Sequence, residues 1–158
     1  YMEFITNQLI AFGRAQIEAG ADVIAISDPS GTGEILGPKY FEEFAVTYIN
    51  RLLNGLQKEK LGTIVHICGQ MSPVYKEINE VESSALSFDS IVPMKEARKH
   101  LPDRVLMGNV STYALEFGDP ARVKILTKSW WNTMRRRRRS PTSTIWKTTD
   151  RTRKLSRG

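Results

Sequence analysis

Apolar residues recur along the chain in two alternating patterns, one typical of helices and one typical of buried strands. The first helical pattern consists of four apolar residues near a 3.6-residue period: Ile5, Leu9, Phe12 and Ile17. Gly20 ends this helix, because glycine readily adopts the conformation that closes a helix. A short run rich in β-branched residues at 22–27 then predicts a strand.

The same order of helix and strand repeats in the middle of the chain. Pro38 suits the first turn of a helix, which extends to about Lys60 with one apolar face formed by Phe41, Phe44, Ala45, Tyr48, Leu52 and Leu56. A second strand is predicted at 63–67. Ser72 and Pro73 predict the N-cap and first turn of a helix that ends near Val81. A third strand follows at 85–88.

The last repeat begins at Pro93, which starts a helix that ends at His100, and a fourth strand is predicted at 104–107. Asp119 and Pro120 cap a further helix that ends near Lys128. Helices that alternate with short buried strands indicate an α/β fold, with a parallel sheet and right-handed crossovers.

Polar side chains follow each predicted strand. They are Asp28 after the first, His66 and Cys68 at the second, Asp89 after the third and Asn109 after the fourth. In a barrel of alternating strands and helices the active site lies at the carboxyl ends of the strands, so these groups are expected at one rim. Taken singly, each also has a structural explanation, as a loop cap, a turn residue or a core histidine. Their repetition favours a site.

His66 and Cys68 form the chemically most specific pair in the sequence. They are two residues apart on a strand, so their side chains leave the same face, and Gly69 permits a close turn beside them. Neutral imidazole and thiolate are natural zinc ligands, and catalytic zinc commonly has three protein ligands and an open position. A buried cysteine is, however, more often inert packing, so the pair alone indicates half of a metal site.

The charge of the chain is concentrated at its end. Residues 129–158 contain ten Arg or Lys against Asp150 alone, a net charge of +9, which leaves −3 for residues 1–128 out of the total of +6. All three tryptophans also lie in this segment, without the period of a packed element. We therefore divide the chain into a partial barrel domain at 1–128 and a basic tail at 129–158.

The tail allows three interpretations. The arginine run at 135–139 could bind nucleic acid. A solvated, disordered tail is the more ordinary explanation. Translation in a shifted reading frame after about Lys128 accounts best for the abrupt change in composition. We therefore expect no nucleic-acid partner.

The rest of the composition is that of an ordinary globular protein, 41% hydrophobic and 25% charged. No apolar stretch reaches the roughly 20 residues of a membrane-spanning helix, so no membrane association is expected. The single cysteine cannot form an internal disulfide. We expect a cytoplasmic protein, and because Tyr1 lies inside a helical pattern without an initiator methionine, an internal fragment.

Four segments of the sequence, in order, resemble the methylcobamide:coenzyme M methyltransferases. They are AGADVIAISDPSGTGEILGPKYFEEF at 19–44, IVHICGQ at 64–70, LSFDSIV at 86–92 and VLMGNVST at 105–112. These enzymes are (β/α)8 TIM barrels of the uroporphyrinogen decarboxylase superfamily. The resemblance, which covers almost all of residues 1–128, therefore implies a partial TIM barrel of about four βα units.

The resemblance also implies a function. His66 and Cys68 would be two ligands of a zinc ion that binds the thiol of coenzyme M, and the thiolate would accept a methyl group from a methylcobamide carried by a corrinoid protein. Asp28 and Asp89 are predicted to be catalytic, lining the pocket or orienting a ligand. Asn109 is predicted to bind substrate.

One departure from the family pattern bears on activity. The family's remaining zinc-ligating cysteine follows a helix like that at 120–128, but here this position holds Trp130, Trp131 and the arginines. We therefore expect the chain as written to be inactive. The decarboxylase branch of the superfamily, which binds tetrapyrrole carboxylates without a metal, is the alternative enzyme, and the His66 and Cys68 pair argues against it.

Overall fold

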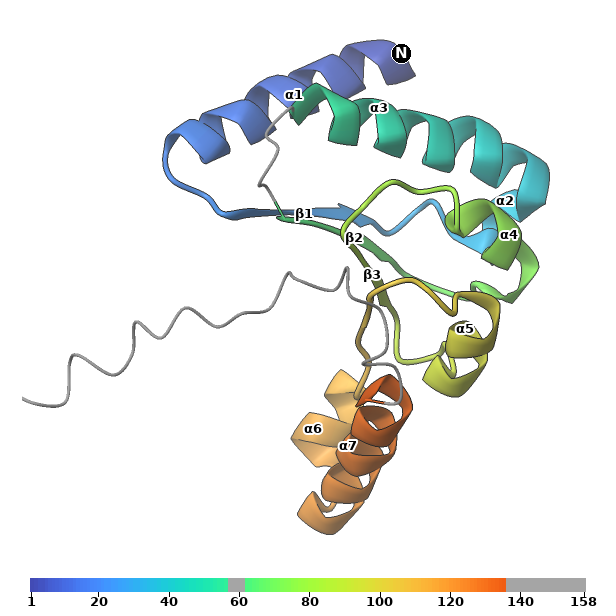
Figure 1. Ribbon diagram of the computed structural model, residues 1–158. Coiled ribbons are helices and arrows are strands. Elements are labelled where there is room, and N and C mark those ends of the chain that lie inside the picture. The colour runs from blue at the N-terminus through green and yellow to red at the C-terminus, as the bar shows by residue number, and fades with distance from the viewer. Residues whose placement is uncertain (57–61, 136–158) are drawn as a thin grey trace, which may run out of the picture.

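Four parallel strands with helices along one face form the framework of the protein (Figure 1). The computed structural model describes residues 1–56 and 62–135. The strands are β1 (Val23–Asp28), β2 (Gly62–Ile67), β3 (Ala85–Phe88) and β4 (Leu106–Met107), hydrogen-bonded in the order β1-β2-β3-β4. Each strand pairs in parallel with the next. The predicted α/β fold is confirmed, and all four strands lie within two residues of their predicted bounds.

The helices connect the strands and cover the sheet. They are α1 (Met2–Glu18), α2 (Gly33–Tyr40), the π-helix η1 (Phe41–Val46), α3 (Thr47–Leu56), the 3-10 helix η2 (Ser72–Val74), α4 (Tyr75–Ile78), α5 (Met94–His100), α6 (Thr112–Phe117) and α7 (Pro120–Arg135). None of these described helices is long and apolar enough to span a membrane.

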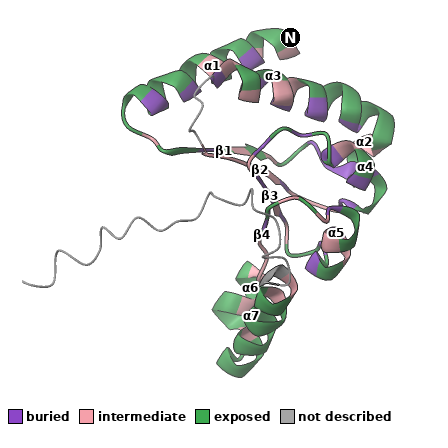
Figure 2. Ribbon diagram, viewed as in Figure 1, coloured by how far each residue is buried: buried purple, intermediate pink, exposed green. Residues whose placement is uncertain are grey.

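The two faces of the sheet differ in burial. Side chains on the helix-covered face are buried in the core, as in Val65, Ile67, Leu86 and Phe88 (Figure 2). Alternate residues on the other face, such as Ser27, His66 and Ser87, are exposed or half-buried. Successive side chains of a strand point to opposite faces. One set of alternate side chains therefore packs in the core, and the other set is accessible to a ligand.

Helix α1 buries a different face from the one that the sequence predicted. Ile17 is buried, but Leu9 and Phe12 are exposed. The buried side instead includes Gly13, where an added Cβ would lie 2.5 Å from Leu56 Cδ2 of α3. The absence of a side chain lets the two helices approach closely, and this contact, rather than the apolar residues, sets the rotation of α1.

The π-helix η1 changes which residues of this segment are buried, compared with the predicted apolar face. Phe41, Ala45, Leu52 and Leu56 are buried as expected. Phe44, however, is 40% exposed, and Ile49 is buried in place of the half-buried Tyr48. Segment η1 has wider turns than an α-helix and so holds more residues per turn. This accounts for the one-residue change from the predicted Tyr48 to Ile49, while Leu52 and Leu56 keep their predicted burial. Upstream, Gly37 (φ 64°) interrupts the helix, so a new turn does begin at Pro38.

Two other predicted features are corrected, and one helix was missed. Ser72 is not an N-cap but the first residue of the 3-10 helix η2, and α4 ends at Ile78 rather than near Val81. The sequence did not predict α6, whose N-cap Ser111 accepts a hydrogen bond from the backbone N–H of Ala114.

The last helix continues beyond the predicted end at Lys128. Asp119 caps α7 as expected, accepting a 2.9 Å hydrogen bond from the N–H of Ala121, but the helix extends to Arg135. Trp130 is half-buried and packs against the core. The expectation that packing stops at 128 is therefore wrong for the first residues of the tail, while residues 136–158 lie outside the described part of the chain. The division into domains at 128 stays a prediction.

Candidate functional site

The centre of the uncovered sheet face carries a row of hydroxyl and imidazole side chains. His66 on β2 pairs in register with Ser27 on β1 and with Ser87 on β3. Paired residues of parallel strands point to the same face, so the three side chains lie side by side. Parallel pairing thus places His66 between two neutral side chains that can form hydrogen bonds.

His66 makes a contact through each ring nitrogen. Nδ1 lies 2.9 Å from Ser87 Oγ, and Nε2 lies 3.5 Å from Cys68 Sγ. The first contact fixes the rotation of the ring, and the second shows that the thiol and Nε2 converge on the same small volume. The prediction that His66 and Cys68 share one face is confirmed by this distance.

Asp89 lies beside this pair. Its Oδ1 accepts a 3.1 Å hydrogen bond from the backbone N–H of Ile91. That bond holds the pKa of the carboxyl below its usual 3.8, although partial burial opposes the shift. Hydrogen bonds from the N–H of Gly69 and the hydroxyl of Ser90, and the nearby charge of His66, lower the pKa further. Asp89 is therefore an ionised group at the edge of the His66 and Cys68 site.

Asp28 leaves the sheet on the opposite face. It pairs in register with Ile67, whose side chain is fully buried under the helices. Its Oδ1 accepts hydrogen bonds from the N–H groups of Ser30 at 3.1 Å and Gly31 at 2.8 Å, which holds the loop before α2. The structure gives Asp28 a loop-capping position and does not bring it together with His66.

Asn109 ties two loops together. Its Nδ2 donates hydrogen bonds to the backbone carbonyls of Asp89, at 2.7 Å, and Val92, at 2.6 Å. These bonds hold the segment that follows β3, including Asp89, against the end of β4. Its predicted role in binding substrate is not tested by this arrangement, but its amide group supports the position of Asp89.

Two residues near the site were not predicted. Ser87 is 21 residues from His66 in sequence, and only the register of β2 and β3 brings them together. Glu34, in the first turn of α2, lies over Gly69: its Oε1 is 2.8 Å from where a Cβ at Gly69 would be. Gly69 also has φ 76°, so this turn favours glycine for two reasons.

The donors present match part of a zinc site. An imidazole nitrogen and a thiol converge within 3.5 Å, and the second ring nitrogen of His66 is held by a hydroxyl, as is usual for metal-binding histidines. Among residues 1–56 and 62–135, however, no group of three or more His, Cys, Asp or Glu side chains is arranged to hold a metal ion. The described residues thus fit two ligands of the predicted zinc and do not complete its coordination.

Comparison with known families identifies the family of the chain. The sequence model described as "Uroporphyrinogen decarboxylase (URO-D)" matches residues 1–140. The chain belongs to the uroporphyrinogen decarboxylase family. Membership of this enzyme family confirms the family resemblance, and the parallel four-stranded sheet accords with part of the TIM barrel that this family forms.

Individual relatives come from two branches of the family. The chain is 28% identical over 128 residues to the methylcobamide:CoM methyltransferase MtbA of Methanosarcina mazei, covering 80% of this chain and 38% of that protein. It is 32% identical over 113 residues to MtaA, a second methylcobamide:CoM methyltransferase, from Methanosarcina barkeri strain Fusaro. It is also 33% identical over 114 residues to a uroporphyrinogen decarboxylase of Desulfotalea psychrophila.

A solved structure shows the same arrangement of elements. A methyltransferase from Methanosarcina mazei superimposes with a TM-score of 0.73 and 28% sequence identity, over 81% of this chain and 38% of that one. The chain spans little more than a third of the length of the relatives it matches. The residues matched by the family model, 1–140, include His66, Cys68 and Asp89.

Proposed function

We propose that His66 and Cys68 bind zinc in an enzyme that transfers a methyl group from a methylated corrinoid protein to a thiol such as coenzyme M. The observation that carries the proposal is the 3.5 Å approach of Cys68 Sγ to His66 Nε2 at the carboxyl end of β2. Relatives named methylcobamide:CoM methyltransferases support it. Zinc bound there would supply a Lewis acid that lowers the pKa of the substrate thiol while leaving the sulfur nucleophilic.

The residues around this pair would have separate roles. Ser87 would keep the ring of His66 rotated so that Nε2 faces the thiol. Asp89 would present its carboxylate to the same space. The backbone N–H of Ile91 holds this carboxylate, and the side-chain amide of Asn109 holds the backbone carbonyl of Asp89. In this proposal Asp89 orients the thiol substrate or supplies a weak third ligand. Asp28 would act only through the loop before α2.

We expect the 158-residue chain by itself to bind zinc weakly. Catalytic zinc commonly has three protein ligands, and Cys68 is the single cysteine of the sequence. A carboxylate such as Asp89 in place of a second thiolate would leave the metal more electrophilic, which suits the bound thiol less well. Incomplete coordination should therefore reduce both zinc retention and turnover.

The test compares this chain with one extended to the length of its relatives and carrying a cysteine on the strand after α7. Zinc is measured by mass spectrometry of the metal, and turnover by methyl-thioether formation from methylcobalamin and coenzyme M. We expect substoichiometric zinc and no turnover in the short chain, and both restored in the long one. Replacement of Cys68 by Ser in the long chain should abolish both. Stoichiometric zinc and turnover in the short chain would contradict the proposed inactivity.

Tetrapyrrole decarboxylation is the second candidate, favoured by the 33% identity to a uroporphyrinogen decarboxylase. The extended chain discriminates between the two, because decarboxylation of uroporphyrinogen without added metal would support this branch. Inactivity in the methyl-transfer assay together with such decarboxylation would overturn the methyl-transfer proposal. The arginine run begins at the last residue of α7 and otherwise lies outside the described residues, so nucleic-acid binding by it stays a prediction, which we do not favour.

A further inference from the structure

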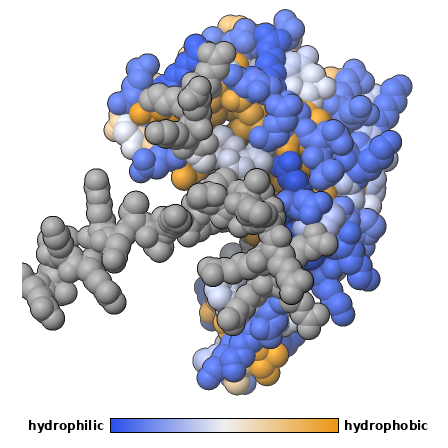
Figure 3. Space-filling model, in the orientation of Figure 1, coloured by the Kyte–Doolittle hydropathy of each residue, from blue (hydrophilic) through white to orange (hydrophobic). Residues whose placement is uncertain are grey.

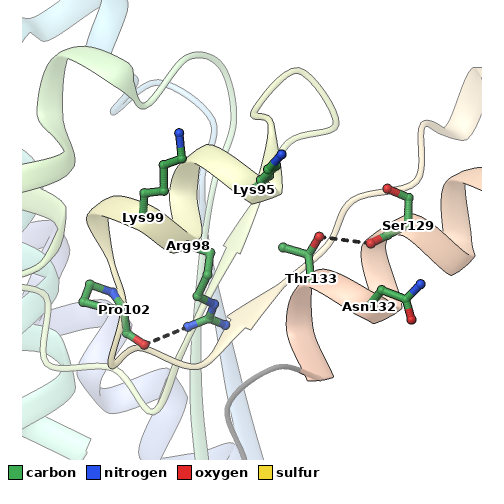
Figure 4. A pocket seen from close by; sticks show the side chains of 7 residues that line it. All are labelled: Lys95, Arg98, Lys99, Pro102, Ser129, Asn132 and Thr133. Carbon is green, nitrogen blue, oxygen red and sulfur yellow. Dashed lines mark hydrogen bonds between the residues drawn. The ribbon is translucent and has the colours of Figure 1, made fainter.

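A groove of about 590 Å³ lies between α5 and α7, and His66 is not among its described lining residues (Figure 4). Its volume falls within the roughly 300–1,000 Å³ of small-molecule sites. The reaction proposed above uses none of the residues that line this groove. Its described lining contains no acidic side chain.

The two walls have complementary chemistry. One wall is α5 with Lys95, Arg98 and Lys99, and the other is α7 with Ser129, Asn132 and Thr133. Each set follows the spacing i, i+3, i+4, which places its members on one face of a helix. The lining thus combines three cations with three neutral polar groups, a composition suited to an anion that needs both charge and hydrogen-bond donors.

Some of these side chains are already engaged. Arg98 donates from its NH1 to the carbonyls of Leu101, Pro102 and Arg104, at 3.2, 3.2 and 2.8 Å, so it holds the end of α5 in place. Thr133 donates its hydroxyl to the carbonyl of Ser129 at 3.0 Å. These two residues shape the walls and contribute charge or acceptors, rather than free donors.

Other donors remain available. Within the described ranges no ion pair involves Lys95 or Lys99, and both are exposed. The hydroxyl of Ser129 and the amide of Asn132 likewise form no side-chain hydrogen bond with the described part of the protein. Two ammonium groups and two neutral donors therefore border the same space.

We propose that the α5–α7 groove binds a small anion that carries a diphosphate group. Lys95 and Lys99 are one helical turn apart, about 6 Å along the axis, which suits two linked phosphoryl groups better than a single one. Ser129 and Asn132 donate to the same oxygens from the opposite wall. Trp130 lies between these two donors in the sequence. It is half-buried and packs against the core, so it anchors the part of α7 that carries them.

The test is calorimetric titration of the full chain with sodium pyrophosphate at low ionic strength. The Lys95→Gln/Lys99→Gln double variant should bind at least about tenfold more weakly, because both charge-assisted contacts are lost. A matched control, Lys76→Gln/Lys124→Gln, removes the same charge from exposed sites outside the groove and should bind within about twofold of the parent. The thermal unfolding of both variants checks that they fold.

Further measurements distinguish specific recognition of the diphosphate group from general attraction to positive charge. Orthophosphate should bind at least about tenfold more weakly than pyrophosphate, and a nucleoside triphosphate comparably to it, if the diphosphate group is what is recognised. Pyrophosphate should also protect Lys95 and Lys99, but not Lys76, from acetylation, as measured by mass spectrometry. Equal weakening in both double variants, unchanged binding in both, or no binding at all would overturn the proposal.

Discussion

Ser87 is the residue whose loss should show most directly how the His66 site works. Ser87→Ala removes the 2.9 Å contact to Nδ1 and frees the ring to rotate away from Cys68. If His66 is a zinc ligand, the zinc affinity should fall about tenfold, as is typical for loss of a group that orients a metal-binding histidine. Competition with a chromophoric chelator measures this. Ser72→Ala, which removes an exposed hydroxyl elsewhere, should leave the affinity unchanged.

Asp89 should make the stability of the protein depend on pH in acid. The pKa of its carboxyl is lowered in the folded state, first by the N–H of Ile91, so the ionised form stabilises the fold above the unfolded value of about 4. This contribution is lost as the pH falls through the lowered folded pKa. Asp89→Asn should therefore reduce the free energy of unfolding at pH 7, and the difference from the parent should shrink below about pH 4.

Urea unfolding at pH 7 and at pH 3 checks this dependence. Asp22→Asn is a suitable control, because Asp22 is exposed and its carboxylate forms no hydrogen bond with the described residues. A difference between Asp89→Asn and the parent that stays constant across this range would contradict the assigned role of the ionised carboxylate.

The residues of the site could be predicted from sequence only where spacing along one strand determines them. The side chains of His66 and Cys68 share a face because they are two positions apart. Ser87 could not be predicted in this way, since its contact depends on strand register. Asp28 and Asp89 both follow predicted strands, but Asp28 is the last residue of β1, and its pairing with Ile67 places it on the other face.

At the scale of helices, Gly55 should prove essential to the packing of α1 on α3. A Cβ at Gly55 would lie 2.5 Å from Cδ1 and 2.7 Å from Cγ1 of Ile10. Gly55→Ala should gain about 1 kcal/mol of helix propensity but lose about 1–3 kcal/mol to overpacking, for a net loss of stability.

Ile10→Ala provides the internal control for this contact. It removes the atoms that the new Cβ would meet, so Gly55→Ala in the Ile10→Ala background should be neutral or stabilising. Urea unfolding of the four proteins of this double-mutant cycle measures the coupling between the two positions. Additive effects of the two substitutions would show that the helices do not pack through Gly55.

The strands were easier to predict than the faces of the helices. Each strand is a short, bounded apolar run whose position does not depend on its neighbours. The rotation of α1 depends instead on Gly13 and Gly55, which carry no hydrophobic signal, and the rotation of α3 depends on the π-helical turn before it. The end of α7 was missed because Trp130 packs through a contact with the core that composition does not reveal.

For the whole molecule, the exposed apolar surface at the α6–α7 end should promote self-association (Figure 3). Tyr113 and Phe117 of α6 are 72% and 66% exposed, and the centroids of their rings lie 5.0 Å apart. Contiguous apolar surface of this kind tends to mark an interaction site or an aggregation-prone region. Tyr113→Gln/Phe117→Gln should therefore lower the average mass seen by sedimentation velocity at high concentration.

The matched control for this surface is Ile35→Gln. Ile35 is 70% exposed but lies on α2, away from α6. It should leave the concentration dependence of the mass unchanged. A monomeric parent chain at all concentrations, or an equal effect of both substitutions, would contradict a role for the α6 surface.

The π-helical turn has a consequence for the chain lengths that this fold can accept. Phe41 and Ile49, both buried, are eight residues apart, whereas two turns of α-helix hold about seven. A single deletion at the exposed Glu43 would therefore convert η1 to α-helix and still leave the two core residues on one line. We expect this deletion to preserve the far-ultraviolet circular dichroism and cooperative unfolding, whereas deletion of Asn50 inside α3 should abolish both. Homologous chains that differ in length by one residue here can thus share one core.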